Sequence, residues 1–248
     1  MNAPDNKVLA KLAEPQMGKD KRPKVLAVQG RKLTAAILVF SLVVVVLMWL
    51  GIGLLVRSER EHAIEQLKNE NLNLARAFAE HATRTMNYVD QLSSQFLRQY
   101  QRLGYHFDLP RYFEESRVDQ DLIINAVIAN ELGNAVNFSQ KKFDPVNLAD
   151  REHFQIHRNR NADDSFISKP IFSRLNNRWS FVVTRRLGKA NGSFGGMLGV
   201  AVDPFYFSRF YARVVLGSGS TVALTGEDGI IRSRIFGDDM SVGQDVSG

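Results

Sequence analysis

The strongest constraint on this chain is an uninterrupted apolar run at residues 33–56. Its sequence, LTAAILVFSLVVVVLMWLGIGLLV, carries no charge, and its only ordinary polar side chains are Thr34 and Ser41. As a helix it would extend roughly 36 Å, at about 1.5 Å per residue, which is enough to cross a ~30 Å hydrocarbon core. A helix of a soluble domain is seldom apolar on every face over such a length. The run therefore predicts a transmembrane helix.

A cleaved signal peptide is the main alternative for this run. The apolar region of a signal peptide covers only about 7–15 residues and ends at a cleavage site of the small-x-small type. The run here is longer, and it ends in Leu54, Leu55, Val56 and Arg57. We therefore expect an uncleaved membrane anchor.

The excess of positive charge lies before this run. Residues 1–32 hold eight Lys or Arg against three acids, whereas residues 57–248 hold 24 against 23. Because basic residues beside a spanning helix stay in the cytoplasm, we expect a cytoplasmic tail at 1–32 and a periplasmic or extracellular domain from residue 57 onward. The absence of cysteine favours a bacterial periplasmic domain, and hence the bacterial inner membrane, over a disulfide-stabilised secreted domain.

Residues 57–106 are expected to form one long helix that continues the membrane helix outward. They contain no proline, and their apolar residues recur mostly three, four or seven positions apart from Ile64 to Leu103. The alternative is two helices with a break in the Asn-rich stretch 69–73. The apolar stripe would either pack against the chain's own domain or form the seam of a dimer.

The remaining sequence is typical of small α+β modules. Residues 107–214 predict an antiparallel sheet with short helices, including a hairpin within 123–139 and a helix at 150–157 with Asp150 as a possible N-cap. Residues 215–248 contain a hairpin with Glu-Asp-Gly at its turn. Two strands have too little core to be stable alone, so we interpret 215–248 as the beginning of a second, incomplete module.

Five short sequence words follow the long helix in a specific order, namely VNLADREHF, FISKPIFS, RWSFVVTRRL, GSFGGMLGVAVDPFYFSRFY and LTGEDGIIRSR. Together they resemble the double Cache (dCache) sensor region of bacterial transmembrane receptors, most of all the sensors that precede GGDEF-type diguanylate cyclase domains. The resemblance covers about residues 33–248. It implies a long helix rising from the membrane, a membrane-distal PAS-like (Cache) module that binds a ligand, and a membrane-proximal Cache module.

The resemblance also implies a ligand site in the distal module. Family members that bind amino acids use an Arg-x-Trp-Tyr word, a later Tyr, and an Asp after a Gly-rich strand. Here Arg151 is kept, His153 and Phe154 stand at the Trp and Tyr positions, Ile171 stands at the later Tyr position, and Asp203 stands at the Asp position. The groups that would hold a carboxylate and an amine are therefore present, whereas the aromatic positions between them are changed.

The same residues have structural interpretations that need no ligand. Arg151 could hold a carboxylate in bidentate fashion or pair with a neighbouring acid. Asp203 could bind a ligand cation or cap the helix that follows it. Trp179 and Phe154 could form an aromatic wall of the pocket or pack in the core.

A metal-dependent enzyme is the rival interpretation from a different class. His153 and His157 are four residues apart on a predicted helix, as a zinc pair would require. The inner Glu of H-E-x-x-H is missing, and no third ligand is evident. There is also no G-x-S-x-G elbow and no phosphate-binding Gly-Lys-Ser/Thr loop. We therefore expect no catalytic residue, metal site or cofactor in this chain, and the basic pairs lack the interleaved aromatics of nucleic-acid binding.

These observations predict a membrane-anchored sensor module of a bacterial signal-transduction receptor. Its expected partners are the membrane, a second copy of the chain, and a small molecule that bears a carboxylate. If the natural protein is longer, a diguanylate cyclase is the expected output, with a histidine kinase or a chemotaxis receptor as the alternatives. An anchored periplasmic metal-dependent enzyme is the rival.

Overall fold

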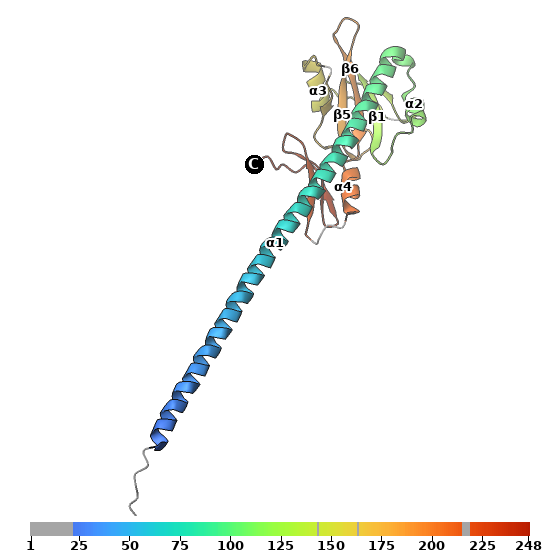
Figure 1. Cartoon of the computed structure of the whole chain (residues 1–248). Coiled ribbons are helices and arrows are strands. Elements are labelled where there is room, and N and C mark those ends of the chain that lie inside the picture. The colour runs from blue at the N-terminus through green and yellow to red at the C-terminus, as the bar shows by residue number, and fades with distance from the viewer. Residues whose placement is uncertain (1–21, 143, 163, 215–218) are drawn as a thin grey trace, which may run out of the picture. The chain divides into compact units, whose positions relative to one another are not determined.

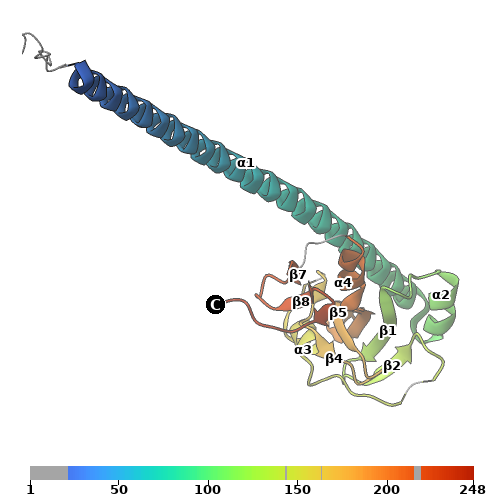
Figure 2. The same cartoon turned by 90° about the horizontal axis from the view of Figure 1, so that it is seen from below.

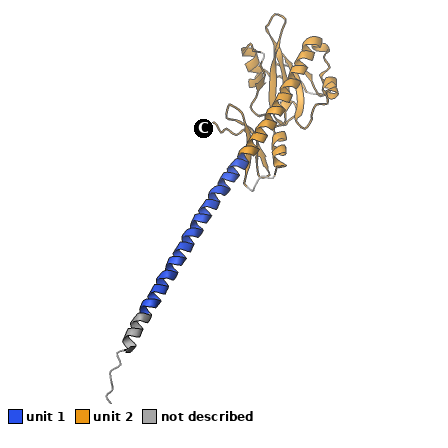
Figure 3. Ribbon diagram, viewed as in Figure 1, with its two compact units in different colours: residues 1–71 blue, residues 72–248 orange. Residues whose placement is uncertain are grey.

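The computed structural model describes residues 22–142, 144–162, 164–214 and 219–248. The chain divides into two compact units, Met1–Asn71 and Leu72–Gly248, which are described separately below (Figure 3). Most of the tail that we expected at residues 1–32 lies outside the described residues. The predicted boundaries between tail, membrane helix, stalk and sheet modules stay predictions.

Helix α1 (Arg22–Leu103), labelled in Figure 1, contributes to both units. In the first unit it contains the apolar run 33–56, whose side chains are exposed throughout. A window of mean hydropathy 2.9 with none of its residues buried makes α1 the one candidate membrane span among the described residues. Its length and composition are sufficient to cross a bilayer. The helix passes through residues 69–73 without interruption, so the alternative of a break there is wrong.

In the second unit, one face of α1 is buried. The buried apolar side chains follow the predicted spacing, and each is at most 9% exposed: Phe78, Ala82, Val89, Leu92 and Phe96. Thr85 and Ser93 lie buried along the same stretch. This part of the stripe packs against the chain's own domain, which was one of the two alternatives. Ile64 and Leu67, which belong to the first unit, are exposed.

A six-stranded antiparallel sheet forms the centre of the second unit. Its strand order is β2-β1-β6-β5-β3, and β4 pairs with β5. The strands are β1 (Ile123–Asn130), β2 (Ala135–Phe138), β3 (Phe166–Ile167), β4 (Ile171–Phe172), β5 (Trp179–Gly188) and β6 (Phe194–Val202). The hairpin predicted within 123–139 is confirmed by the antiparallel pairing of β1 with β2. The predicted fold class, a long helix followed by antiparallel-sheet modules, is confirmed.

The two faces of this sheet pack against different helices, because side chains alternate along a strand. Ile128 and Val200 belong to the apolar cluster that includes the buried face of α1. Val127 and Met197 belong to a second cluster, which includes Phe154 of helix α3 (Glu152–Asn159). Figure 2 shows the sheet between the end of α1 and α3. The α3 face is therefore separated from α1 by the thickness of the sheet.

The start of α3 differs from the prediction. The N-cap is Arg151 and makes no side-chain capping bond, whereas Asp150 was expected to cap a helix at 150–157. The Asp150 carboxylate instead accepts two hydrogen bonds from the Arg174 guanidinium, at 2.9 and 2.8 Å. Because these bonds hold both carboxylate oxygens of Asp150, the prediction of a cap at this residue is wrong. A shorter helix, α2 (Leu109–Glu115), precedes the first strand of the sheet.

A smaller three-stranded sheet follows helix α4 (Phe205–Ala212). It consists of β7 (Thr221–Thr225), β8 (Ile231–Phe236) and β9 (Asp239–Ser241). The predicted Glu-Asp-Gly hairpin is confirmed, with Gly229 at φ +73 in its turn. Helix α4 packs on this sheet, where the Ser208 and Ser233 hydroxyl oxygens are 2.6 Å apart. Ile235 of β8 and Phe207 of α4 lie in the same apolar cluster as α1.

Candidate ligand-binding site

A small cavity of about 30 Å³ lies on the α3 face of the six-stranded sheet. Three of the six residues that the sequence singled out line it, namely Arg151, His153 and Ile171. Most of the remaining wall is apolar and consists of Val127, Leu148, Leu175, Val182, Met197 and Ala201. A water molecule needs about 10–15 Å³ of such space, so the cavity has room for about two waters.

The strands build this cavity through their two-residue period. Asn125 and Val127 project from the same side of β1, and Ser180 and Val182 project from the same side of β5. Between these strands, β6 has Gly199, which is paired with Val127. A Cβ atom at Gly199 would lie 3.1 Å from the Val182 Cγ1 atom and 3.4 Å from that of Val127. The glycine therefore lets the side chains of the two neighbouring strands approach each other over β6.

Three residues of the lining each have a side-chain polar atom that is buried without a hydrogen-bond partner among the described residues. These atoms are Asn125 Nδ2, Ser180 Oγ and Arg151 Nε. Asn125 is 1% exposed and Ser180 is 0% exposed. Buried polar groups are almost always paired, and an unpaired one costs about 1–3 kcal/mol. This concentration of unpaired groups marks the cavity as a place where a bound molecule would be stabilised.

Arg151 differs from the other arginine at the cavity, Arg174. The Arg174 guanidinium is tied to Asp150, whereas the Arg151 side chain makes no hydrogen bond or ion pair with any described residue. Burial, and then the positive charge of Arg174, lower the pKa of the Arg151 guanidinium. An arginine remains charged at neutral pH even so. Arg151 is therefore a cationic donor for which the described structure provides no acceptor.

The two histidines of α3 have different surroundings. His153 is 3% exposed, and burial, followed by the charge of Arg151, lowers its pKa to about 4. It is therefore neutral at pH 7. His157 Nε2 lies 2.8 Å from the Thr184 hydroxyl oxygen on β5. Within the described residues, no group of three or more His, Asp or Glu side chains is placed to hold a metal ion.

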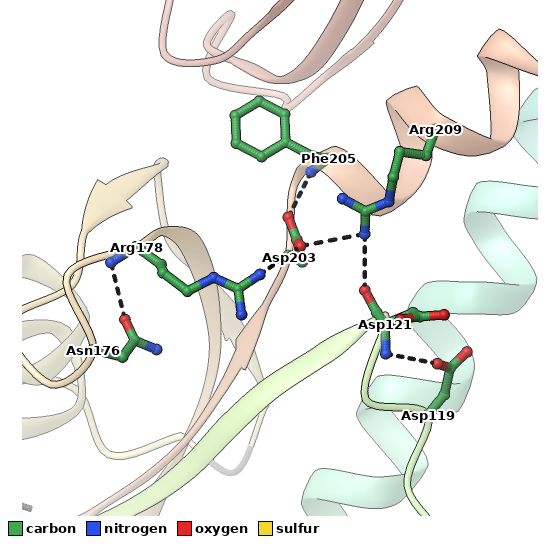
Figure 4. Close-up of polar contacts among 7 residues, drawn as sticks. All are labelled: Asp119, Asp121, Asn176, Arg178, Asp203, Phe205 and Arg209. Carbon is green, nitrogen blue, oxygen red and sulfur yellow. Dashed lines mark hydrogen bonds and ion pairs between the residues drawn. The ribbon is translucent and has the colours of Figure 1, made fainter.

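Asp203 lies outside the cavity, in a cluster of its own (Figure 4). Its carboxylate Oδ2 accepts hydrogen bonds from Arg178 at 3.0 Å and from Arg209 at 3.3 Å. Its Oδ1 accepts the backbone N–H of Phe205 at 2.9 Å, at the start of α4. Arg209 also donates to the backbone carbonyl of Asp121 at 3.2 Å. Both carboxylate oxygens of Asp203 are thus bound by groups of the protein.

The remaining two predicted residues, Phe154 and Trp179, do not line the cavity either. Phe154 is fully buried, and its ring packs edge-on against Phe194 with centroids 5.3 Å apart. Trp179 is 42% exposed and packs edge-on against Phe172 at 5.8 Å. Phe154 therefore has the core-packing position that was the alternative to an aromatic wall.

The sequence interpretation missed Asn125 and Ser180. Each is a polar residue within a mostly apolar stretch of its strand, IINAVIAN and WSFVVT respectively. That interruption of an apolar run was the available signal. It could not be used without the strand register, which decides the face on which each residue lies.

A larger groove of about 620 Å³ lies between β3 and the β7–β8 turn. Arg232 and Asp228 in its wall are paired by hydrogen bonds of 2.7 and 3.0 Å. These bonds already satisfy both oxygens of the Asp228 carboxylate. Arg232 Nε is the one buried unpaired atom among the described lining residues of this groove, so we place the candidate site at the smaller cavity, where three residues have such atoms.

The comparisons with known proteins concern the fold. No protein-family model and no curated protein sequence matches the chain. Among solved structures, the chain is similar to the extracellular domain of rpHK1S-Z16, a protein assigned as a histidine kinase. The identity is 26%, the TM-score is 0.59, and 70% of this chain and 71% of that chain are covered.

Two chemoreceptor structures share the fold at lower identity. The ligand-binding domain of Pseudomonas fluorescens CtaA, in complex with L-serine, is 14% identical with a TM-score of 0.54, over 67% of this chain and 71% of that one. The ligand-binding domain of Campylobacter jejuni Tlp3, in complex with 4-methylisoleucine, is 13% identical with a TM-score of 0.50, over 65% and 67%. The structural neighbours of this chain are therefore extracellular, Cache-like sensory domains of histidine kinases and chemoreceptors.

Proposed function

We propose that this chain is the membrane-anchored, extracytoplasmic sensor part of a bacterial signal-transduction receptor, and that it binds a small molecule in the cavity at Arg151. One observation carries the proposal. Arg151, Asn125 and Ser180 bring unpaired buried polar atoms to a single cavity, in a fold shared with extracellular sensory domains. The expected polar contacts of the ligand are these three residues, and His153 and Ile171 of the same lining are expected to contact it as well.

A physical connection from the cavity to α1 supports a signalling role. Ser180, at the cavity, and Arg185 belong to the same strand, β5. The Arg185 guanidinium donates to Ser93 Oγ at 2.9 Å and to Asp90 Oδ1 at 2.6 Å, both on α1. A ligand that favours one position of β5 would therefore favour one position of this part of α1. Such a shift requires different ligand affinities in the two states.

A binding experiment tests the site. Thermal unfolding of the full chain in detergent micelles is followed by tryptophan fluorescence during a screen of small carboxylates and amino acids. At least one compound is expected to raise Tm in the unmodified chain and to have no effect on Arg151→Gln. Arg178→Gln is the matched control, because Arg178 is half-exposed and lies outside the cavity. A hit that stabilises Arg151→Gln equally well would contradict the assignment of the cavity.

The proposed orientation places the N-terminus in the cytoplasm and residues 57–248 in the periplasm, with α1 crossing the inner membrane. Its support is the excess of basic residues before the apolar run. Alkaline phosphatase, which is active only after export, is expected to be active when fused after Gly248, whereas β-galactosidase, which is active only in the cytoplasm, is expected to be inactive at the same position. The reverse pattern would show that the orientation is wrong.

The output of the receptor is a separate part of the proposal. A diguanylate cyclase domain is expected from the resemblance of the sequence words, and a histidine kinase is favoured by the similarity to rpHK1S-Z16. Reading the coding sequence downstream of Gly248 distinguishes the two. A second apolar run followed by either domain would support the receptor, whereas an unrelated domain would contradict it.

We also propose that two copies of the chain pair along α1. The support is a pair of exposed apolar side chains outside the membrane run, Ile64 and Leu67, which are 54% and 59% exposed. Because the chain has no cysteine, a single introduced cysteine gives an unambiguous crosslink. Ile64→Cys is expected to form a disulfide-linked dimer in membranes, and Gln66→Cys, two positions away on the helix, is expected to form less. Equal crosslinking of both variants would argue against a specific seam.

A further inference from the structure

The unpaired groups of the cavity are mostly donors. Arg151 Nε and Asn125 Nδ2 can only donate, and Ser180 Oγ can donate or accept. A ligand that satisfies all three must present acceptor oxygens close together. A carboxylate does this, because its two oxygens accept several hydrogen bonds and carry the charge that complements a guanidinium.

No acidic side chain lines the cavity in the described part of the chain. Of the two acids adjacent to Arg151 in sequence, Asp150 is held by Arg174, and Glu152 is exposed and lines the larger groove. Asp203 is held by Arg178, Arg209 and the backbone N–H of Phe205. An ammonium group on the ligand would therefore enter a cationic site without a carboxylate to pair with. Burying an unpaired charge is strongly unfavourable.

The remaining space and wall limit the rest of the ligand. The cavity of about 30 Å³ is a fraction of the size of a typical drug-sized ligand pocket and holds about two waters, so even a short carboxylate enters only if the surrounding side chains move outward. Much of the wall around the donors is apolar, with Val127, Val182 and Met197 projecting from the three neighbouring strands. This apolar part suits a methyl or ethyl group, and the polar remainder of the wall consists of His153, Ser173 and Arg174.

We propose that the ligand of this cavity is a short unbranched monocarboxylate of two or three carbons, such as acetate or propionate, and not an amino acid. The inference rests on the proposed sensor function, whose site it shares. The carboxylate is held by Arg151, Asn125 and Ser180, and the alkyl group contacts the apolar wall. An amino acid is not expected because Asp203, the residue that would bind its amine, already has its carboxylate bound by Arg178, Arg209 and the Phe205 N–H.

Propionate and glycine give a decisive comparison, because they have nearly the same shape and differ in a methyl group against an ammonium group. The full chain in detergent micelles is titrated with acetate, propionate, glycine, alanine and nitrate while Tm is recorded. Acetate and propionate are expected to raise Tm by about 5 °C at 100-fold excess over Kd. Glycine and alanine are expected to leave Tm unchanged, and nitrate, which lacks the alkyl group, is expected to give a smaller rise.

Two variants connect the response to the cavity. Asn125→Asp places a carboxylate beside Arg151, so it should abolish the response to acetate and propionate and raise Tm without ligand. Ser180→Ala should weaken propionate binding about tenfold. Asp203→Asn is the matched control and should respond like the unmodified chain. If Asn125→Asp does not fold, Arg151→Gln provides the same test.

Each outcome decides between the two proposals. Stabilisation by glycine or alanine, without stabilisation by acetate or propionate, would overturn the ligand class and leave the sensor function standing. Equal stabilisation by nitrate and propionate would overturn the role of the apolar wall. If no compound in this set or in the wider screen raises Tm, the cavity holds only water, and both the ligand class and the ligand-sensing function fail.

Discussion

Arg151 and Asp203 come from the same expected ligand site, yet they have opposite surroundings. The Asp203 cluster is complete, since two arginines and a backbone N–H occupy both carboxylate oxygens. The Arg151 cavity is incomplete, since its cationic group and two neighbouring polar atoms have no partner among the described residues. A complete cluster contributes to folding, whereas an incomplete one leaves interaction energy available for a ligand. The following predictions test this comparison, from the largest expected effect to the smallest.

Acidification should have the largest effect on the free energy of unfolding, and the residue responsible, His153, lines the Arg151 cavity. Because the pKa of His153 is about 4 in the folded protein and about 6.5 in an unfolded chain, the unfolded state binds more protons between these values. Stability should therefore be full above about pH 6.5, fall as the pH decreases, and level off below about pH 4. The expected loss from this residue is about 3 kcal/mol.

Urea unfolding of the full chain at pH 7 and pH 4.5 measures this loss. His153→Gln should remove most of this acid-induced loss of stability. His106→Gln, which changes an exposed histidine, should leave the loss unchanged. The same acid sensitivity in both variants would show that other groups are responsible.

Loss of the carboxylate at Asp203 should have the next largest effect. Asp203→Ala removes the acceptor for two arginines and for the Phe205 N–H, and it should lower the free energy of unfolding by about 2 kcal/mol. Asp203→Asn keeps an acceptor for that N–H and should lose about half as much. Chemical denaturation at pH 7 measures both. A variant at this position that kept its stability and lost its ligand response would place Asp203 in the binding site.

The smallest effect on stability is expected at Arg151. Without ligand, Arg151→Gln should change the free energy of unfolding by less than about 1 kcal/mol, because no hydrogen bond is lost and a partly buried charge is removed. The same denaturation experiment measures this difference. A loss of 2 kcal/mol or more would show that Arg151 is a structural residue, and the contrast with Asp203 would disappear.

Periodicity alone predicted much of the fold. The apolar stripe of α1 and the two hairpins involve residues close in sequence, so their spacing and turn residues identify them. The start of α3 was mispredicted because Asp150 pairs with Arg174, a contact between separate segments. The candidate site depended on such contacts throughout. The positions of Asn125 and Ser180 follow from strand register, and the partners of Asp203 come from two different segments.

The buried guanidinium of Arg185 restricts how α1 can move relative to the sheet. It is 13% exposed and binds Asp90 and Ser93 at 2.6 and 2.9 Å. A slide of α1 by one turn, about 5.4 Å, would break both bonds and leave the largely buried charge of Arg185 without its partner. Small rotations or tilts would strain these bonds without breaking them. In the sensor that we propose, a shift of the sheet would therefore reach this part of α1 as a rotation or tilt of the helix and not as a slide along its axis.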